Sequence, residues 1–257
     1  MDSKKLCTDC KEVKDLNKFY PLSGSKDGKR LMCNICYRKR YEVSMKRRSL
    51  RLKELPNTLN TCEKKEIRSY FHNACALTGN ASDVRLDHFV PVAWGTTPLK
   101  YGLGGTRVSN MVPLDNFLNN STSSKNPFDW FDSNKVKHNL SESKWEEILE
   151  YLARKNGMSE VQFRNTVNAC FKEVKIKRWV ERLESKSGWK SDLLDRPLPQ
   201  ITHLLFHGVN IDVAVQVYGS SELNDFIKSE YMQNIIKNAK DRYKERVDRK
   251  FSCEMKV

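Results

Sequence analysis

Two closely spaced cysteine pairs near the start of the chain constrain its fold more than any other feature. Cys7 and Cys10 form one Cys-x-x-Cys pair, and Cys33 and Cys36 form a second. Each pair can present two thiolates to one tetrahedral ion, and four thiolates fill the coordination sphere of zinc. A redox Cys-x-x-Cys motif would not need a second copy, so the repeat favours metal binding. Buried thiols without a ligand are the alternative. Because four protein ligands close the site to substrate, we expect one structural Zn²⁺ that serves folding.

The composition of the 257-residue chain favours several small modules over one deep core. Hydrophobic residues make up 39% and charged residues 30%, and the mean hydropathy is −0.68. No apolar run is long enough to cross a bilayer. Met1 is also not followed by an apolar segment of the kind that a signal peptide contains. We therefore expect an intracellular, cytoplasmic protein, in which a reducing environment keeps the cysteines as thiols or metal ligands.

Positive charge is concentrated in the first fifth of the chain. The net charge is +14, and residues 1–55 hold 16 Lys and Arg against 7 Asp and Glu. The stretch after Cys36 lacks Gly and Pro until Pro56, which indicates a basic helix. A helix so one-sided in charge predicts contact with a phosphate backbone, and a merely solvated face is the alternative. The residues expected to make this contact are Arg38, Lys39, Arg40, Lys46, Arg47, Arg48 and Arg51.

The candidate chemistry begins with a neighbouring carboxylate and imidazole. The short β-branched and apolar run Arg85–Pro91 predicts a strand, which places Asp87 and His88 side by side on opposite faces. A carboxylate can hold a divalent metal, and an adjacent neutral imidazole can take a proton from water. The pair is therefore a candidate centre for hydrolysis.

A second strand and a helix are expected downstream of this pair. Val108–Leu114 is strand-like, and Pro113 is expected to stop it. Asp115–Asn120 then predicts the first turns of a helix that carries a further oxygen ligand. Two strands and a helix around one metal form a compact unit that can activate water against a phosphodiester.

The order of these motifs resembles the HNH nuclease family of the ββα-metal, or His-Me finger, class. The shared pattern is Asp-His-x-x-Pro, Gly-Gly-Thr, Asn-x-Val-Pro-Leu, an asparagine nine positions after the first, and a closing Lys-Asn-Pro-Phe-Asp-Trp. It covers residues 75–130, under a quarter of the chain. The N-terminal cysteine module is similar to the zinc ribbons found in front of many phage HNH nucleases.

The resemblance implies a role for each matching residue. His88 would be the general base, Asp87 and Asn119 would bind a catalytic Mg²⁺ or another divalent ion, and Asn110 would brace the loop between the strands. Lys125 would contact phosphate. The implied activity is hydrolysis of double-stranded DNA to 5′-phosphate and 3′-hydroxyl ends, by an endonuclease of the phage homing or free-standing type.

Several features depart from the family pattern. Asn120 is a rival to Asn119 for the ligand position, and Thr122 stands where a lysine is common. Ala93–Leu103 looks like an insertion. These departures keep two alternatives open, namely a restriction-type HNH endonuclease and a non-catalytic, zinc-containing DNA-binding regulator.

A second zinc site is not expected. Cys75 fits the first position of a knuckle that many family members carry in this core. Asp115 and Leu118 stand where the later cysteines would be. We expect Cys62 and Cys75 to be free thiols.

The expected fold is α+β and modular. Its parts are a four-cysteine zinc ribbon (1–40), a basic helix and linker (41–60), a ββα-metal nuclease core (61–132) and a helical region (133–257). In the last part, Ser143 is expected to begin a capping box and Ser159 to open another helix. Residues 211–230 loosely resemble a helix-turn-helix. His203 and His207 have a spacing that could chelate a metal on a helix, but no acidic partner is fixed nearby.

Overall fold

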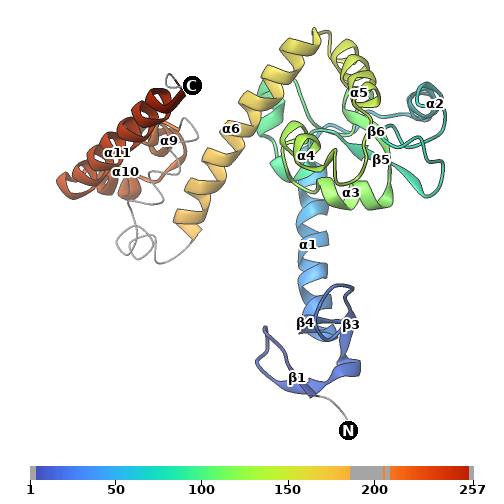
Figure 1. The fold of residues 1–257 in the computed structure, drawn as a ribbon, viewed down its shortest axis with the longest axis horizontal. Helices are drawn as coiled ribbons and strands as arrows, with labels where there is room; N and C mark the ends of the chain where they lie inside the picture. Colours follow the sequence, from blue (N-terminus) through green and yellow to red (C-terminus); the bar gives the residue numbers. More distant parts are fainter. Residues whose placement is uncertain (1–3, 186–204, 206–208, 255–257) are drawn as a thin grey trace. The chain divides into compact units, whose positions relative to one another are not determined.

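The structure is a computed structural model that describes residues 4–185, 205 and 209–254 (Figure 1). The chain is mixed α+β, as expected, and its described part contains helices and three two-stranded antiparallel sheets. It divides into two compact units, Met1–Thr96 with Gly104–Ser124 and Thr97–Leu103 with Lys125–Val257. No helix in the described ranges is long and apolar enough to cross a membrane. His203 and His207 lie outside these ranges.

Two small hairpins begin unit 1. Strand β1 (Lys4–Leu6) pairs with β2 (Val13–Asp15), and β3 (Phe19–Pro21), which follows the turn η1 (Leu16–Lys18), pairs with β4 (Lys29–Cys33). Such short strands need additional links to be stable.

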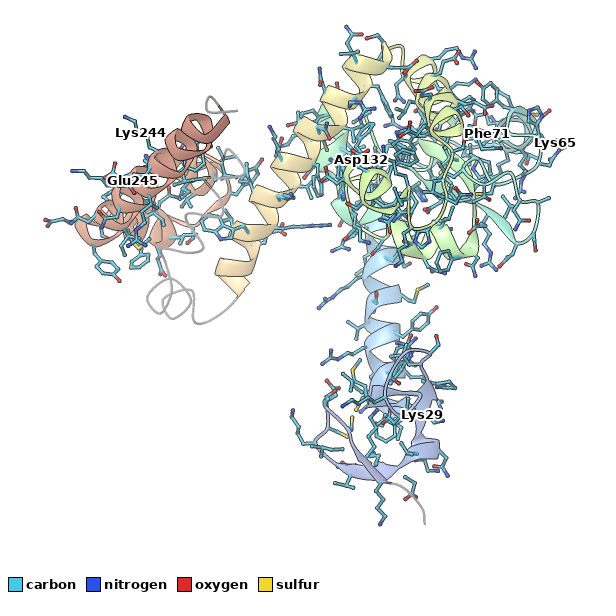
Figure 2. The ribbon with its side chains drawn as sticks, viewed as in Figure 1. Lys29, Lys65, Phe71, Asp132, Lys244 and Glu245 are labelled. Carbon is cyan, nitrogen blue, oxygen red and sulfur yellow. The ribbon has the colours of Figure 1, made fainter. Side chains whose placement is uncertain are left out.

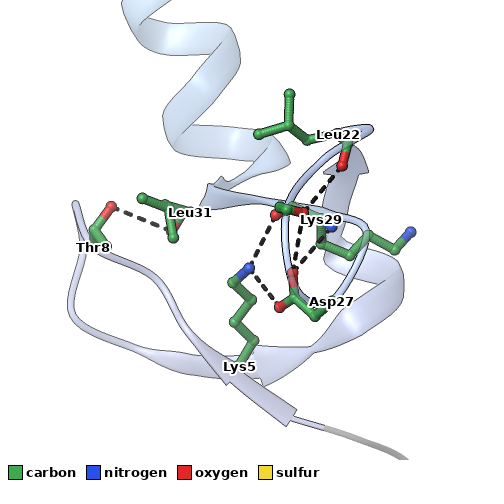
Figure 3. Close-up of polar contacts among 7 residues, drawn as sticks. Lys5, Thr8, Leu22, Asp27, Lys29 and Leu31 are labelled. Carbon is green, nitrogen blue, oxygen red and sulfur yellow. Dashed lines mark hydrogen bonds and ion pairs between the residues drawn. The ribbon is translucent and has the colours of Figure 1, made fainter.

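Lys5 provides one link between the hairpins. Its Nζ donates to Asp27 Oδ2 at 2.6 Å and to the Lys29 carbonyl at 3.0 Å (Figure 3). The Thr8 hydroxyl donates to the Leu31 carbonyl at 3.2 Å. These contacts tie β1 to the β3–β4 hairpin.

Helix α1 (Asn34–Glu54) follows β4 directly and runs across the expected module boundary at residue 40. Every residue from 38 to 51 is exposed (Figure 2). Its last turn carries Arg51 and Lys53, which suit the negative end of the helix dipole. The helix packs against the turn η2 (Val92–Trp94).

The rest of unit 1 is an antiparallel hairpin with two helices. Strand β5 (Val84–His88) pairs with β6 (Met111–Asp115), and α3 (Asn116–Thr122) follows. Helix α3 packs on both strands, and α2 (Thr61–Tyr70) packs on β6. The Asp115 side chain caps α3 by accepting the Leu118 N–H at 2.8 Å.

The second strand differs from the expectation. Val108–Asn110 is a 3-10 turn (η4), and the strand starts only at Met111. Pro113 does not stop it but lies within it, opposite Leu86. A two-stranded sheet tolerates proline because each strand is an edge. The Pro113 carbonyl also accepts the Ala76 N–H at 2.8 Å.

The segment expected to be a linker, residues 56–60, has a structural role. Asn57 forms a parallel bridge with Thr106. Asn60 caps α2, because its side chain accepts the Glu63 N–H and the Glu63 carboxylate accepts the Asn60 N–H, both at 2.9 Å. Helix α2 therefore begins directly after this cap, at Thr61, and ends at Tyr70.

Unit 2 is helical in its described part. Its elements are η3 (Thr97–Tyr101), α4 (Pro127–Asn134), α5 (Glu142–Lys155), α6 (Glu160–Ser185), α9 (Ile211–Tyr218), α10 (Ser221–Lys228) and α11 (Glu230–Glu254). The rings of Phe131 and Trp145 stack with centroids 4.4 Å apart and join α4 to α5. A second core gathers apolar residues of α9, α10 and α11 around Trp179 and Val180 of α6.

Two helix starts in unit 2 test the capping expectations. The cap of α5 is Ser141, whose Oγ accepts the Lys144 N–H at 3.4 Å, so the expected capping box at Ser143 was two residues late. Ser159 does open α6, since its Oγ accepts the Gln162 N–H at 3.2 Å. The two serines near the start of α5 explain the error, because either fits the sequence pattern.

Glu173 joins the inserted segment to the helices of unit 2. Its carboxylate accepts hydrogen bonds from Lys100 at 2.6 Å, from the Tyr101 hydroxyl at 2.7 Å and from the Tyr218 hydroxyl. Burial raises the pKa of Glu173, but these three donors outweigh it and lower the pKa to about 2. Glu173 thus connects η3, α6 and α9.

Replacing Glu173 with Gln should lower the free energy of unfolding at pH 7 by about 2 kcal/mol, because charge-assisted hydrogen bonds are lost. The depressed pKa stabilises the fold above about pH 4.5, and this contribution disappears as the pH falls toward 2. Thermal unfolding is measured at pH 7 and at pH 2, and the variant should be less stable than the parent at pH 7 only. The exposed Glu181→Gln is the control, and an equal deficit there would contradict the assignment.

Candidate functional site

Asp87 and His88 end strand β5 and form the centre of the candidate site. Asp87 lies opposite Val112 and His88 opposite Met111. Neighbouring strand residues point to opposite faces, as the sequence predicted. Both side chains are half-buried.

His88 has a fixed hydrogen-bond partner. Its Nε2 lies 2.9 Å from the Thr106 hydroxyl oxygen. A hydroxyl can either donate or accept, so this contact orients the ring in either tautomer. When Nε2–H donates to Thr106, the lone pair of Nδ1 is left to accept a proton.

Thr106 is in turn held by the segment after α1. Its N–H donates to the Pro56 carbonyl at 2.8 Å, and its carbonyl accepts the N–H groups of Thr58 and Leu59, each at 3.1 Å. Gly105 makes this approach possible, because its φ is +75° and an added Cβ would lie 2.8 Å from the Pro56 oxygen. The backbone therefore sets the position of the hydroxyl that orients His88.

Asn110 closes the long connection between β5 and β6. Its buried side chain accepts the Val90 N–H at 2.8 Å and donates to the carbonyls of Val90 at 3.2 Å and Gly105 at 2.9 Å. Its own carbonyl accepts the Phe89 N–H at 2.9 Å. One amide thus joins the residues just after His88 to those just before Thr106.

Burial and a nearby cation keep His88 neutral. Burial lowers the pKa of the imidazole, Arg48 of α1 lowers it further, and the resulting pKa is about 4. At pH 7 the ring is therefore unprotonated and able to accept a proton.

The pKa of the Asp87 carboxyl group shifts in the opposite direction to that of His88, because burial disfavours the charged form of each group. Burial raises the pKa of Asp87, while the His88 backbone N–H, the Arg48 charge and the Thr122 hydroxyl partly oppose the rise. A bound divalent cation would favour the ionised carboxylate of Asp87.

Helix α3, which carries Asn119, contacts the Asp87 carboxylate through Thr122. The Thr122 hydroxyl lies 2.8 Å from the Asn119 carbonyl and 3.4 Å from Asp87 Oδ2. The amide of Asn119 makes no hydrogen bond with the described residues. Asn120, its rival, is exposed and donates back to the Asn116 carbonyl at 2.7 Å. The free amide oxygen of Asn119 and the Asp87 carboxylate are hard oxygen donors of the kind that Mg²⁺ prefers.

The four N-terminal cysteines come together as the sequence predicted. The sulfurs of Cys7, Cys10, Cys33 and Cys36 all lie within 4.8 Å of one another. Four sulfurs bound to one zinc ion at about 2.3 Å lie roughly 3.8 Å apart, so the cluster can hold a metal such as zinc. The Cys33 N–H also donates to Cys7 Sγ at 3.3 Å. Burial raises the pKa of Cys7, but such backbone donors lower it to about 6, which favours the ligating thiolate.

The second knuckle position carries no such cluster. Cys75 is buried, and the Thr78 hydroxyl lies 3.4 Å from Asp115 Oδ2. Within the described ranges, the N-terminal cysteines are the only grouping of three or more His, Cys, Asp or Glu ligands. Neither Cys62 nor Cys75 forms a disulfide with a described residue.

The basic residues expected to contact DNA are exposed on α1. Lys39, Arg40, Arg47 and Arg51 line a shallow hollow on one side of the helix. Arg40 also forms an ion pair with Asp9. Arg38 lies on the opposite side of the helix, given 100° of rotation per residue. Lys46 and Arg48 complete the set, and Arg48 also acts on the two site residues.

Lys125 does not belong to the same unit as the other site residues. It is exposed and stands at the start of the second stretch of unit 2, just before the α4 cap Asn126. Asp87, His88, Asn110 and Asn119 all belong to unit 1, whereas Lys125 belongs to unit 2.

Comparisons of the chain with protein-family models, curated proteins and solved structures found no match. Interpretation of the site therefore rests on its geometry. Sequence reasoning gave no role to Thr106, although it belongs to the Gly-Gly-Thr motif, and no catalytic role to Arg48. The hydrogen bonds that hold Thr106 against residues 56–59 had no sequence signal, because they join backbone groups.

Replacing Arg48 with Gln should raise the pKa of His88, because a positive charge that disfavours the imidazolium is removed. The measurement is a proton NMR titration of the His88 ring, which should give a value near 4 in the parent and a higher value in the variant. Arg38→Gln removes an equal charge about 15 Å further along the axis of α1 and should change nothing. A parent value near 6.5, or a decrease in Arg48→Gln, would contradict this electrostatic picture.

Proposed function

We propose that this protein is a metal-dependent DNA endonuclease of the HNH type. The observation that carries the proposal is a half-buried Asp87 next to a neutral His88 at the end of β5, the strand on which α3, the helix that carries Asn119, packs. A carboxylate and an amide oxygen beside an unprotonated imidazole are the groups that metal-assisted phosphodiester hydrolysis requires. The resemblance of the sequence motifs points to the same chemistry.

His88 acts as the general base in this proposal. The Thr106 hydroxyl oxygen accepts a hydrogen bond from Nε2–H, and Nδ1 takes a proton from the attacking water. A pKa near 4 makes His88 a weaker base than one tuned to neutrality, but it keeps nearly every molecule unprotonated at pH 7. Contact with a phosphate would raise the basicity of His88 during the reaction, since nearby negative charge favours the imidazolium.

Asp87 and Asn119 would hold the divalent ion, with Mg²⁺ as the expected species. When bound, the ion supplies positive charge to the phosphate and the departing 3′ oxygen. The Thr122 hydroxyl contacts Asp87 Oδ2 and the backbone carbonyl of Asn119, so α3 lies against the proposed metal ligand Asp87. Arg48 places a further positive charge near the reacting phosphate. The expected products are a 5′ phosphate and a 3′ hydroxyl.

Double-stranded DNA is the proposed substrate because of the charge of the protein. The exposed basic face of α1 matches a phosphate backbone, and α1 also carries Arg48 to the candidate site. The zinc cluster at the start of α1 would fix the N-terminal hairpins that precede this helix. A phage homing or free-standing nuclease is the favoured role, and a restriction enzyme would instead recognise a short palindrome.

The direct test is incubation of supercoiled plasmid and phage DNA with the purified protein, with magnesium and with EDTA. Magnesium-dependent conversion to nicked or linear DNA is expected. His88→Ala should reduce the rate by at least about 100-fold, because general-base catalysis is lost. It should leave DNA binding nearly unchanged.

Asn120→Ala is the matched control, because Asn120 is exposed and hydrogen-bonds only along its own helix. Its cleavage rate should stay close to that of the parent. Equal cleavage by His88→Ala and the parent would refute the proposed base. Salt-sensitive binding without cleavage of any DNA would favour the regulator alternative.

A further inference from the structure

Unit 2 contains a polar groove that the proposed catalytic site does not use. The groove has a volume of about 470 Å³ and lies between the start of α4 and one face of α6. The side chains that matter for its chemistry are Asn126, Asp129, Asn165, Asn168, Lys172 and Lys175. Apart from Asp129, each of them can donate a hydrogen bond.

The amide of Asn168 has a defined orientation in this groove. Asn126 is buried, and its Oδ1 caps α4 by accepting the Phe128 N–H at 2.9 Å. Its Nδ2 donates to Asn168 Oδ1 at 2.8 Å. Because this bond uses the oxygen of Asn168, the NH₂ group of Asn168 remains available as a donor.

Two lysines supply the charge of the groove. Lys172 and Lys175 are exposed and lie about one helical turn apart on α6. Lys175 Nζ lies 4.6 Å from the centroid of the Phe171 ring, which restricts its stem. Neither lysine forms an ion pair with a described residue, so both charges are available to a ligand.

The combination of donors selects the class of ligand. Two ammonium groups about one turn apart suit successive phosphates of a nucleic-acid backbone. Asparagine amides and the Asp129 carboxylate can bond base edges as donors and acceptors. A simple anion would be repelled by the Asp129 carboxylate. A nucleotide can instead place its phosphate near the lysines and donate a hydrogen bond from its base to Asp129.

We propose that this groove is a second DNA-binding site, carried by unit 2 and separate from the basic face of α1. The identity of the ligand rests on the proposed nuclease function. Each of the two units then holds DNA through its own residues, and the protein contacts more of the duplex than α1 alone would. This contact is separate from the one expected of residues 211–230, where the exposed face of α10 carries Glu222, Asp225 and Lys228.

The test compares two double variants in the full-length His88→Ala protein, which does not consume the DNA. Lys172→Gln/Lys175→Gln removes the groove charges, and Lys237→Gln/Lys240→Gln removes two exposed lysines with the same spacing on α11. Binding to a labelled duplex is measured across a range of salt concentrations. The groove variant should bind about tenfold more weakly, and the slope of log K against log salt should shrink by about 1.8. The α11 variant should change both quantities little.

A second pair of variants tests the amide. In Asn168→Asp the new carboxylate can still accept the Asn126 Nδ2 hydrogen, so the fold is retained while the groove donor becomes a negative charge. Asn234→Asp on the exposed face of α11 is the control. Asn168→Asp should weaken DNA binding several-fold more than the control.

Unchanged binding by both groove variants, or equal losses in both control variants, would overturn the inference. Its failure is separable from failure of the nuclease proposal, because plasmid cleavage is measured with His88 intact. A groove that binds DNA in a protein that never cuts would support the inference and refute the nuclease.

Discussion

The buried amide of Asn110 is the constraint on which the candidate site depends. It bonds backbone groups of Val90 and Gly105, which lie far apart in the connection between β5 and β6. Without it, each orphaned polar group would cost about 1–3 kcal/mol, and the loop would have no fixed closure. With the loop closed, Gly105 packs on Pro56 and Thr106 reaches His88. Asn110, a structural residue, thus fixes the position of Thr106 and through it the orientation of His88.

Local sequence patterns predicted the features that depend on near neighbours. The cysteine spacing gave the N-terminal cluster, because two knuckles must converge to bury their sulfurs. The short β-branched and apolar run around Asp87 predicted strand β5, and the run Asp115–Asn120 predicted the start of α3, of which Asp115 proves to be the cap. In each case the residues that determine the structure are close together in the sequence.

Contacts between distant segments could not be predicted in this way. Pro113 was expected to end its strand. It lies within the strand instead, at an edge where no N–H is needed, and its carbonyl accepts the Ala76 N–H. The role of the inserted segment depends on Glu173, more than 70 residues away, which has no local signal. The dual position of Arg48, on a basic face and beside His88, likewise follows only from the packing of α1.

We propose that one divalent ion binds beside neutral His88 through Asp87 and Asn119. The most direct test of this proposal is titration of the protein with manganese(II), observed as paramagnetic broadening of the His88 ring signals in NMR spectra. The account predicts strong broadening at about one equivalent, lost in Asp87→Ala and Asn119→Ala and retained in Asn120→Ala. Sharp His88 signals in the parent, or broadening that persists without Asp87 and Asn119, would contradict it.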